Sequence, residues 1–232
     1  NKFIENSFKT GLDIINKGIT NKFINGPILK KKFLKNKFPG ITEYLAKKNK
    51  RKKFAMLIYN KKLAVCPLTT HVPLKKVNKL VTKKNIKEKV ELINNFYKKF
   101  RGFQPKIAVL GLNPHCESTD KFNEDTKIVS PIINNLRNNG YNISGPYSAD
   151  TAFLRANKKK FDVILGMYHD QVLTPFKTLY EYDAINITLG LSFIRITPDH
   201  GPNIQMLGKN KSNPISLINA IKFLDKYWLK LK

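Results

Sequence analysis

Three short apolar segments, separated by segments with helical periodicity, constrain the fold of this chain more than any other feature. They are Lys106–Leu112 (KIAVLGL), Phe161–Tyr168 (FDVILGMY) and Ala184–Leu189 (AINITL). Continuous apolar runs of this length are typical of strands that are buried on both faces. Because helical patterns alternate with them, the sequence predicts an α/β fold with a substantially parallel sheet.

Local patterns predict the other elements. Phe54–Tyr59 and Leu63–Leu68 are apolar runs joined by a short polar turn, which predicts a hairpin. Apolar residues recur at helical spacing over three further ranges, the last of which should end at Gly140: Lys2–Lys17, Lys87–Phe100 and Ser130–Asn139.

A final helix is expected to follow Asn213 and Pro214, which are favourable at a helix N-cap and at the first helical position. The spacing predicts that it runs to about Leu229. Five large residues are expected to face the core: Leu217, Ile218, Ile221, Leu224 and Trp228.

The formal net charge of +27 raises the question of a nucleic-acid partner. Only five of the 43 basic residues are arginine, the residue best suited to base edges and phosphates. The lysines are also spread along the chain rather than gathered in one arm. We therefore expect no specific nucleic-acid partner, and keep a basic nucleic-acid-binding protein on an inactive scaffold as an alternative.

Membrane insertion and disulfide bonding are not expected. No apolar run approaches the roughly 18 residues that a membrane-spanning helix needs, and the polar start of the chain does not resemble a signal peptide. Two cysteines, Cys66 and Cys116, give neither a disulfide framework nor a metal-type spacing. A cytoplasmic location is expected, and the first residue, Asn1, leaves open a natural beginning further upstream.

Three of the four histidines stand just beyond an apolar run: His71, His115 and His169. Functional groups gather at the carboxyl ends of parallel strands, and imidazole is the commonest side-chain ligand of catalytic metals. We expect His71 and His115 to lie close together in one metal site. The other interpretation is that these histidines bind nearby backbone at the surface, and their spacing alone leaves both open.

Five polar residues in or beside apolar segments are further candidates. Asp150 and Asp170 could orient a histidine or act as a base, although either could be a simple loop or N-cap residue. Lys177, Asn186 and Arg195 suit a phosphate or carboxylate ligand, although each could lie on a solvated flank. No GxGxxG motif is present, so a conventional Rossmann nucleotide site is not supported.

Taken together, several strings resemble the 4-hydroxythreonine-4-phosphate dehydrogenase family of pyridoxal phosphate biosynthesis. They occur in the family's order and cover the chain from about Asn25 to the last helix. The strings are NGPILKK, GITEYLA, LTTHVPL, KIAVLGLNPH, GPYSADTAF, MYHDQVLTPFK, INITLGLSFIR and DHG.

The resemblance implies a three-layer α/β/α fold similar to isocitrate and isopropylmalate dehydrogenases, with two domains and a cleft. The expected division is a partial first domain (1–33), a metal- and substrate-binding domain (34–192) and a C-terminal return to the first domain (193–232). The resemblance also implies a homodimer whose metal site is shared between subunits.

The activity implied is the NAD-dependent oxidation and decarboxylation of 4-phosphohydroxy-L-threonine to 3-amino-2-oxopropyl phosphate, with a divalent Zn, Mg or Co ion. Carried over by motif, the metal ligands would be His71, His115 and His169. Thr42, Lys177, Asn186 and Arg195 would bind substrate, and Asp150, Asp170 and Lys177 would support the chemistry.

Three departures from the family pattern affect these expectations. Ile41 replaces a histidine that contacts substrate in the family, the loop Cys116–Asp120 replaces a glycine-rich loop, and the family's GDPAGIG region has no counterpart. These departures leave open another 4-phosphorylated hydroxy acid, such as erythronate or threonate 4-phosphate, as the substrate. They also put the activity of the chain by itself in doubt.

Overall fold

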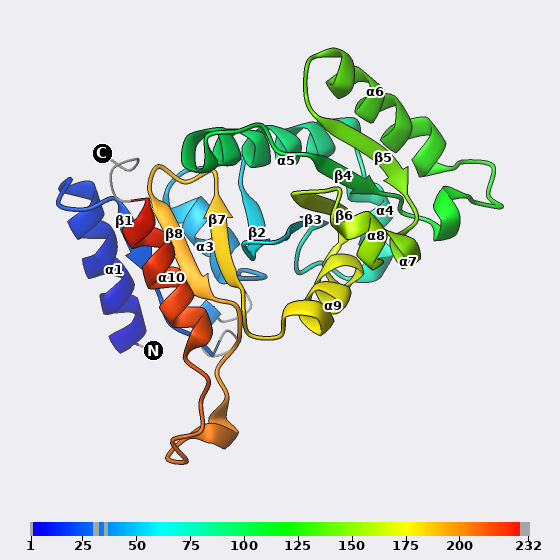
Figure 1. Ribbon diagram of the computed structural model, residues 1–232. Coiled ribbons are helices and arrows are strands. Elements are labelled where there is room, and N and C mark those ends of the chain that lie inside the picture. The colour runs from blue at the N-terminus through cyan, green and yellow to red at the C-terminus, as the bar shows by residue number, and fades with distance from the viewer. Residues whose placement is uncertain (1, 30–32, 35–36, 228–232) are drawn as a thin grey trace. The chain divides into compact units, whose positions relative to one another are not determined.

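The computed structural model describes residues 2–29, 33–34 and 37–227. The chain divides into two compact units (Figure 1). The terminal unit combines Asn1–Phe54 with Tyr182–Lys232, and the central unit is the continuous segment Ala55–Glu181. Domain boundaries at 33/34 and 192/193, expected from the resemblance, stay a prediction about the functional domains.

The central unit contains a five-stranded mixed sheet in the order β2-β3-β6-β4-β5. The hairpin strands β2 and β3 are antiparallel, as predicted, and β3, β6, β4 and β5 run parallel. Their bounds are Ala55–Tyr59 for β2, Ala64–Thr69 for β3, Val163–Tyr168 for β6, Ile107–Leu110 for β4 and Ile143–Tyr147 for β5.

Helices lie on both sides of this sheet (Figure 1). The main ones are α5 (Lys83–Phe96), which a π-turn extends to Arg101, α6 (Ser130–Asn138) and α9 (His169–Tyr180). Shorter helices are α4 (Val77–Leu80), α7 (Ala149–Ala152) and α8 (Arg155–Lys158). Gly140 follows α6 with a left-handed φ of 82°, as expected for a residue that ends a helix.

The terminal unit contains β1 (Lys22–Ile24), β7 (Ile185–Leu189) and β8 (Ile194–Pro198). Strand β8 pairs in parallel with β1 and antiparallel with β7, although β1 and β8 lie far apart in sequence. The main helices in the described part of this unit are α1 (Lys2–Asn16), α3 (Ile41–Lys48) and α10 (Ile215–Lys226). The α/β fold class predicted from the sequence is confirmed.

The prediction of which face of α10 packs against the core is wrong. Leu217, Ile218 and Ile221 are 40%, 40% and 53% exposed, and of the expected set only Leu224 is buried, whereas Trp228 lies outside the described residues. The helix packs on the three strands through another face, formed by Ser216, Ala220, Phe223 and Leu224. Both faces of this helix are apolar, so helical spacing alone could not decide between them.

A hydrogen-bonded serine fixes the observed face of α10. The Ser216 hydroxyl donates to the carbonyl of Ala184 and accepts from the backbone N–H of Asp199 at 2.8 Å. A fully buried hydroxyl is retained only where it has such partners. The Asn213 side chain accepts from the N–H of Ile215 at 3.0 Å, and α10 begins at Ile215, one residue later than predicted.

We predict that Cys66 will not react with a thiol reagent at pH 8 while the protein is folded. Cys66 is fully buried in β3, and burial raises the pKa of its thiol to about 12. The unfolded chain ionises this thiol near pH 8.5, so the native state should also lose stability as pH rises from there towards 12. Labelling a Cys116→Ser variant with and without denaturant measures the reactivity. Rapid native labelling would contradict the prediction.

Candidate active site

The carboxyl edge of the central sheet holds most of the candidate residues. Because β3, β6, β4 and β5 are parallel, their carboxyl ends share this edge. His71 follows the end of β3, His169 directly follows β6, His115 lies in the loop after β4, and Asp150 lies in α7 after β5. Strand order therefore brings together residues that are almost 100 positions apart in sequence.

His71 and His169 form a pair within one chain. Their ring centroids are 5.5 Å apart, with an angle of 39° between the rings. We expected His115 to be the neighbour of His71, but β6 lies between β3 and β4. The sheet order thus makes His169 the adjacent histidine, and a position of His115 in the same metal site stays a prediction.

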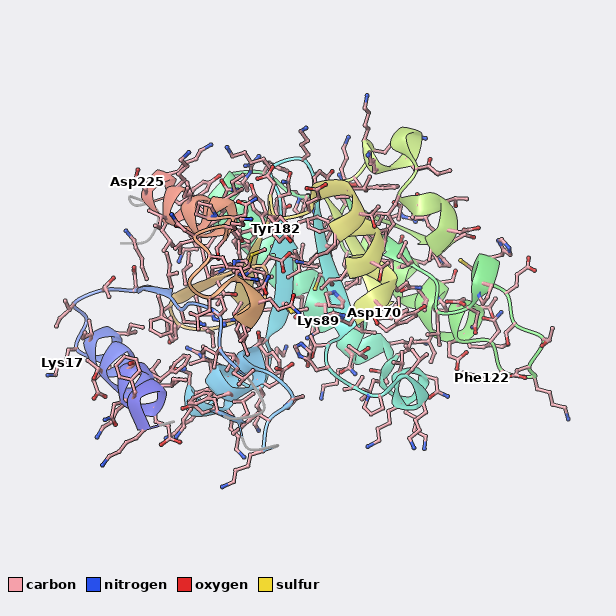
Figure 2. The ribbon with its side chains drawn as sticks, turned by 90° about the horizontal axis from the view of Figure 1, so that it is seen from below. Lys17, Lys89, Phe122, Asp170, Tyr182 and Asp225 are labelled. Carbon is pink, nitrogen blue, oxygen red and sulfur yellow. The ribbon has the colours of Figure 1, made fainter. Side chains whose placement is uncertain are left out.

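Asp170 orients the His169 ring. Its Oδ1 lies 2.6 Å from Nδ1 of His169, and it is labelled at the start of α9 in Figure 2. A carboxylate on one ring nitrogen favours the tautomer whose other nitrogen, Nε2, has a free lone pair. This arrangement is the one that metal-binding histidines usually show.

His115 is held in a strained loop. Both His115 and Cys116 have a left-handed backbone, with φ of 54° and 62°, a conformation that costs of order 1–3 kcal/mol for residues other than glycine. The strain presents the exposed imidazole towards Asp150, whose Oδ2 lies 4.0 Å from its Nδ1. Such strain persists only where surrounding contacts enforce it.

The buried carboxylate of Asp125 anchors the start of this loop. It is fully buried at the start of the short π-helix Asp125–Val129. Its Oδ1 accepts from the N–H of Leu112 at 2.7 Å, and its Oδ2 accepts from the backbone and side-chain N–H groups of Asn113, both at 3.0 Å. Sequence reasoning missed this residue, because the eleven residues after Asn113 gave no periodic signal.

Over the residues with described positions, no three His, Cys, Asp or Glu side chains converge as a ready metal-binding group. The donors that do converge still fit a divalent ion, since two imidazoles lie side by side and one of them is oriented by a carboxylate.

A second polar cluster surrounds Arg195 in the terminal unit. The guanidinium is 3% exposed; its Nε donates to Oδ1 of Asn25 at 2.8 Å, and one terminal nitrogen donates to the hydroxyls of Thr188 at 2.9 Å and Thr42 at 3.4 Å. Burial lowers the pKa of Arg195 to about 9, and the charge of Glu43 opposes that shift. A buried cation with mainly neutral partners is suited to receive an anion.

Strand register explains why these residues meet. Thr188 pairs with Arg195 and Asn186 pairs with Thr197, so the four side chains share one face of β7 and β8. Oδ1 of Asn186 is buried and has no hydrogen-bond partner among the side chains and backbone described. The alternation in INITL and FIRIT could have indicated this polar face, including Thr188, whereas nothing in the sequence indicated Asn25.

The expected substrate residues are divided between the two units. Thr42, Asn186 and Arg195 belong to the terminal unit, and Thr42 contacts Arg195 directly. Lys177 lies in the last turn of α9, in the central unit that carries the histidines. Ile41, at the position of the family's histidine, is buried in an apolar cluster with Phe8, Phe33, Leu34 and Leu45.

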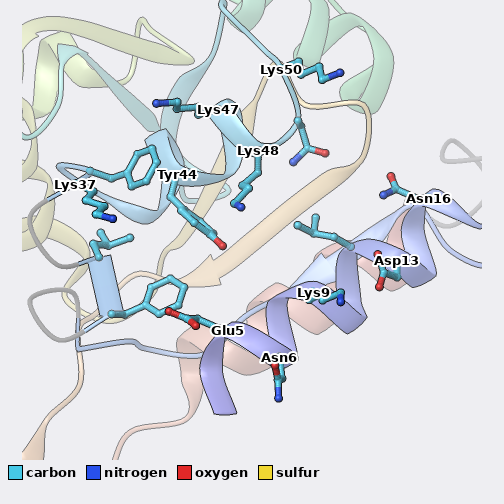
Figure 3. Close-up of a pocket in the computed structure, with 15 residues that line it drawn as sticks. Glu5, Asn6, Lys9, Asp13, Asn16, Lys37, Tyr44, Lys47, Lys48 and Lys50 are labelled. Atoms are coloured by element: carbon cyan, nitrogen blue, oxygen red, sulfur yellow. The ribbon is translucent and has the colours of Figure 1, made fainter. Parts of the chain in front are cut away.

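A cavity of about 830 Å³ in the terminal unit contains none of the expected residues. Side chains from α1 and α3 line it, and Tyr44 points into it (Figure 3). Its lining combines aromatic rings with five lysines and two carboxylates: Phe33, Phe38, Tyr44, Lys9, Lys37, Lys47, Lys48, Lys50, Glu5 and Asp13. The cavity and the polar cluster around Arg195 share no residues.

Known structures share this fold. A putative 4-hydroxythreonine-4-phosphate dehydrogenase from Salmonella typhimurium matches with a TM-score of 0.78 and 32% identity, over 94% of this chain and 68% of that chain. A terephthalate 1,2-cis-dihydrodiol dehydrogenase from Burkholderia xenovorans matches with a TM-score of 0.68 at 21% identity, over 93% and 69% of the two chains, which shows the fold alone. In class, the chain is an α/β oxidoreductase of the dehydrogenase type.

Sequence comparison identifies the family. The 4-hydroxythreonine-4-phosphate dehydrogenase of Sulfurihydrogenibium sp. is 44% identical over 95% of this chain and 68% of its own length. The Aquifex aeolicus enzyme of the same name is 43% identical over 81% of this chain and 58% of its length. The chain belongs to the family described as pyridoxal phosphate biosynthetic protein PdxA, whose model matches residues 1–224. No helix in the described part of the chain has the length and apolarity to cross a membrane.

We predict that Asp170→Asn will weaken divalent-metal binding while leaving the fold intact. The substitution replaces the carboxylate on Nδ1 of His169 with a weaker acceptor, and losing such an outer partner typically lowers metal affinity roughly 10- to 100-fold. Because the Asp170 side chain is 79% exposed, the melting temperature should change little. Isothermal titration with Zn²⁺ measures the affinity. An unchanged affinity would contradict the orienting role.

Proposed function

We propose that this chain carries the metal- and substrate-binding part of an NAD-linked dehydrogenase that oxidises and decarboxylates 4-phosphohydroxy-L-threonine to 3-amino-2-oxopropyl phosphate. The observation that carries the proposal is the His71–His169 pair at the carboxyl edge of the sheet, with Asp170 on Nδ1 of His169. Because the chain spans 68% and 58% of two of its relatives, the activity of the whole enzyme is part of the proposal.

The proposed metal ligands are His71, His169 and His115, with a Zn, Mg or Co ion bound between subunits of a homodimer. The sharing between subunits is part of the proposal: over the described residues the rings of His71 and His169 are in contact, and no three metal-binding side chains converge within one chain. When bound, such an ion would lower the pKa of a substrate hydroxyl and polarise the adjacent carbonyl. Asp170 would keep His169 in the tautomer that binds it, and Asp150 would restrain His115.

The proposed substrate contacts are Thr42, Asn186, Arg195 and Lys177. Arg195 supplies a charged fork for a phosphate or carboxylate, and its largely neutral surroundings favour an incoming anion. The buried Oδ1 of Asn186 could accept from a substrate ammonium or hydroxyl, since leaving such an acceptor without a donor costs about 1–3 kcal/mol. Lys177 adds a point charge from α9. NAD⁺ would accept the hydride.

A second substrate is favoured by two observations. A D-threonate 4-phosphate dehydrogenase from Pectobacterium atrosepticum is 37% identical over 80% of this chain. Ile41, which cannot donate a hydrogen bond or titrate, stands where the resemblance expects a histidine. Both 4-phosphorylated hydroxy acids share the phosphate and the oxidisable hydroxyl, so the same cluster could bind either.

Turnover distinguishes these substrates. The protein would be incubated with NAD⁺, Zn²⁺, Mg²⁺ or Co²⁺, and one of three compounds: 4-phosphohydroxy-L-threonine, D-threonate 4-phosphate or erythronate 4-phosphate. NADH formation at 340 nm and release of CO₂ would be followed together. We expect both signals to be greatest with 4-phosphohydroxy-L-threonine. A preference for another compound would replace the proposed substrate, and no NADH with any of them would overturn the proposal for this chain.

A further inference from the structure

Side-chain hydrogen bonds join the ends of three strands of the central unit. Oγ1 of Thr69 donates to the carbonyl of Met167 at 2.8 Å, which links β3 to β6. Oε1 of Gln171 accepts from the N–H of Met167 at 2.7 Å, and Nε2 of Gln171 donates to the carbonyl of Gly111 at 2.7 Å, which links β6 to β4. The three linked strands are those followed by His71, His169 and His115.

Gln171 takes the place of backbone pairing at this point. The last register pair between β4 and β6 is Val109 with Leu165, so Gly111 lies past the end of that ladder. The N–H of Gly111 still donates to Tyr147 on the β5 side at 2.9 Å, while its carbonyl is bound by Gln171 on the β6 side. One amide side chain therefore continues the sheet by two residues towards the histidine loop.

Close packing fixes this amide in position. A Cβ atom on Gly166 would lie 2.9 Å from Oε1 of Gln171 and 2.4 Å from the Val172 side chain, so the strand approaches α9 as closely as glycine allows. A Cβ atom on Gly111 would lie 2.7 Å from Sγ of Cys116 and 3.1 Å from Oδ1 of Asp125. Space is lacking beside Oε1 of Gln171 at Gly166, which limits the rotamers open to this side chain.

We propose that Gln171 is a positioning residue that sets the separation between the His169 and His115 backbones, and so the geometry of the metal site. Gln171 lies in the first turn of α9, two residues after His169, and its amide holds that turn against the end of β4. Thr69 extends the same link to the strand before His71. The proposal rests on the metal site of the proposed function and adds a residue outside the ligand set.

The chemistry of the link requires an amide. Glutamine has a donor and an acceptor at one end of its side chain, and both are used here. In Gln171→Glu the acceptor for Met167 remains, but a carboxylate would face the Gly111 carbonyl with no proton to donate. In Gln171→Met the volume is nearly kept and both hydrogen bonds are lost.

Co²⁺ binding to the protein tests the proposal. The wild type, Gln171→Met, Gln171→Glu and the matched control Gln104→Met would each be titrated with Co²⁺, recording affinity, the visible absorption spectrum and the melting temperature. Gln104 is a suitable control because its Nε2 also donates to a glycine carbonyl in the central unit, that of Gly140 at 2.6 Å. The spectrum reports coordination geometry, which a general loss of stability would not shift.

We expect both Gln171 variants to bind Co²⁺ roughly 10- to 100-fold more weakly, the range found for residues that support metal ligands, and to show an altered spectrum. Gln104→Met should match the wild type in affinity and spectrum. Wild-type affinity and spectrum in Gln171→Met would overturn the positioning role of Gln171 but would not contradict the proposed metal site. If the wild type itself binds no Co²⁺, the metal site of the proposed function fails, and this proposal fails with it.

Discussion

Replacing His169 with alanine is expected to lower divalent-metal affinity by about 100-fold or more, because it removes a ligand rather than a group that supports one. The rings of His169 and His71 are in contact, at 5.5 Å between centroids. Since both are proposed to bind one ion, the effects of His71→Ala and His169→Ala should not add. Once one ligand has been removed, removing the second should lower the metal affinity little further.

Isothermal titration with Co²⁺ or Zn²⁺ measures the two single variants and the double variant. His200→Ala is the matched control, because His200 is exposed in the terminal unit and contacts the carbonyl of Gly201. We expect the control to bind as the wild type does. If the losses of binding free energy in His71→Ala and His169→Ala are additive, or if the control loses as much affinity, the two histidines do not form one site.

Asp125→Ala is expected to destabilise the protein by about 3 kcal/mol or more, which lowers the melting temperature of a chain of this length by roughly 6–12 °C. The carboxylate accepts three hydrogen bonds in a fully buried position, so its loss leaves three N–H groups of Leu112 and Asn113 without their acceptor. The loop that holds His115 in its left-handed conformation would lose its anchor at the same time.

Thermal unfolding followed by circular dichroism measures this effect. Asp125→Asn should have a melting temperature between those of the wild type and Asp125→Ala, because the amide keeps one acceptor oxygen and loses the other. Asp120→Ala, in the exposed part of the same loop, is the control and should lie within about 0.5 kcal/mol of the wild type. A small loss of stability in Asp125→Ala would contradict the prediction and would mean that solvent or other groups can accept from the freed N–H donors.

Strands β2, β3, β4, β6 and β7 could be predicted from the sequence, because burial on both faces requires continuous apolar runs. Strands β1, β5 and β8 were not predicted. FDVILGMY and AINITL are β6 and β7 with differences of one or two residues at their ends. Strand order could not be predicted in the same way, since it depends on long-range pairing. The insertion of β6 between β3 and β4 is what makes His169, rather than His115, the neighbour of His71.

The candidate site was recognisable by residue type more than by contacts. Histidines beyond strand ends and polar residues inside apolar runs marked both clusters. The groups that hold them, Asp125, Gln171 and Asn25, gave no comparable signal, because their roles depend on hydrogen bonds across 4 to 170 positions of sequence. For α10, two apolar faces competed, and the buried hydrogen bonds of Ser216 decided between them.

The pairing of β1 with β8 has a consequence for how the chain folds during synthesis. Lys22 of β1 pairs with Ile194 of β8, and the whole central unit, residues 55–181, lies between them in sequence. At typical rates of translation, β8 leaves the ribosome on the order of ten seconds or more after β1. The central unit is continuous and can fold during that interval, whereas β1 must wait with its backbone groups exposed. The sheet of the terminal unit therefore cannot be completed until β8 has been synthesised.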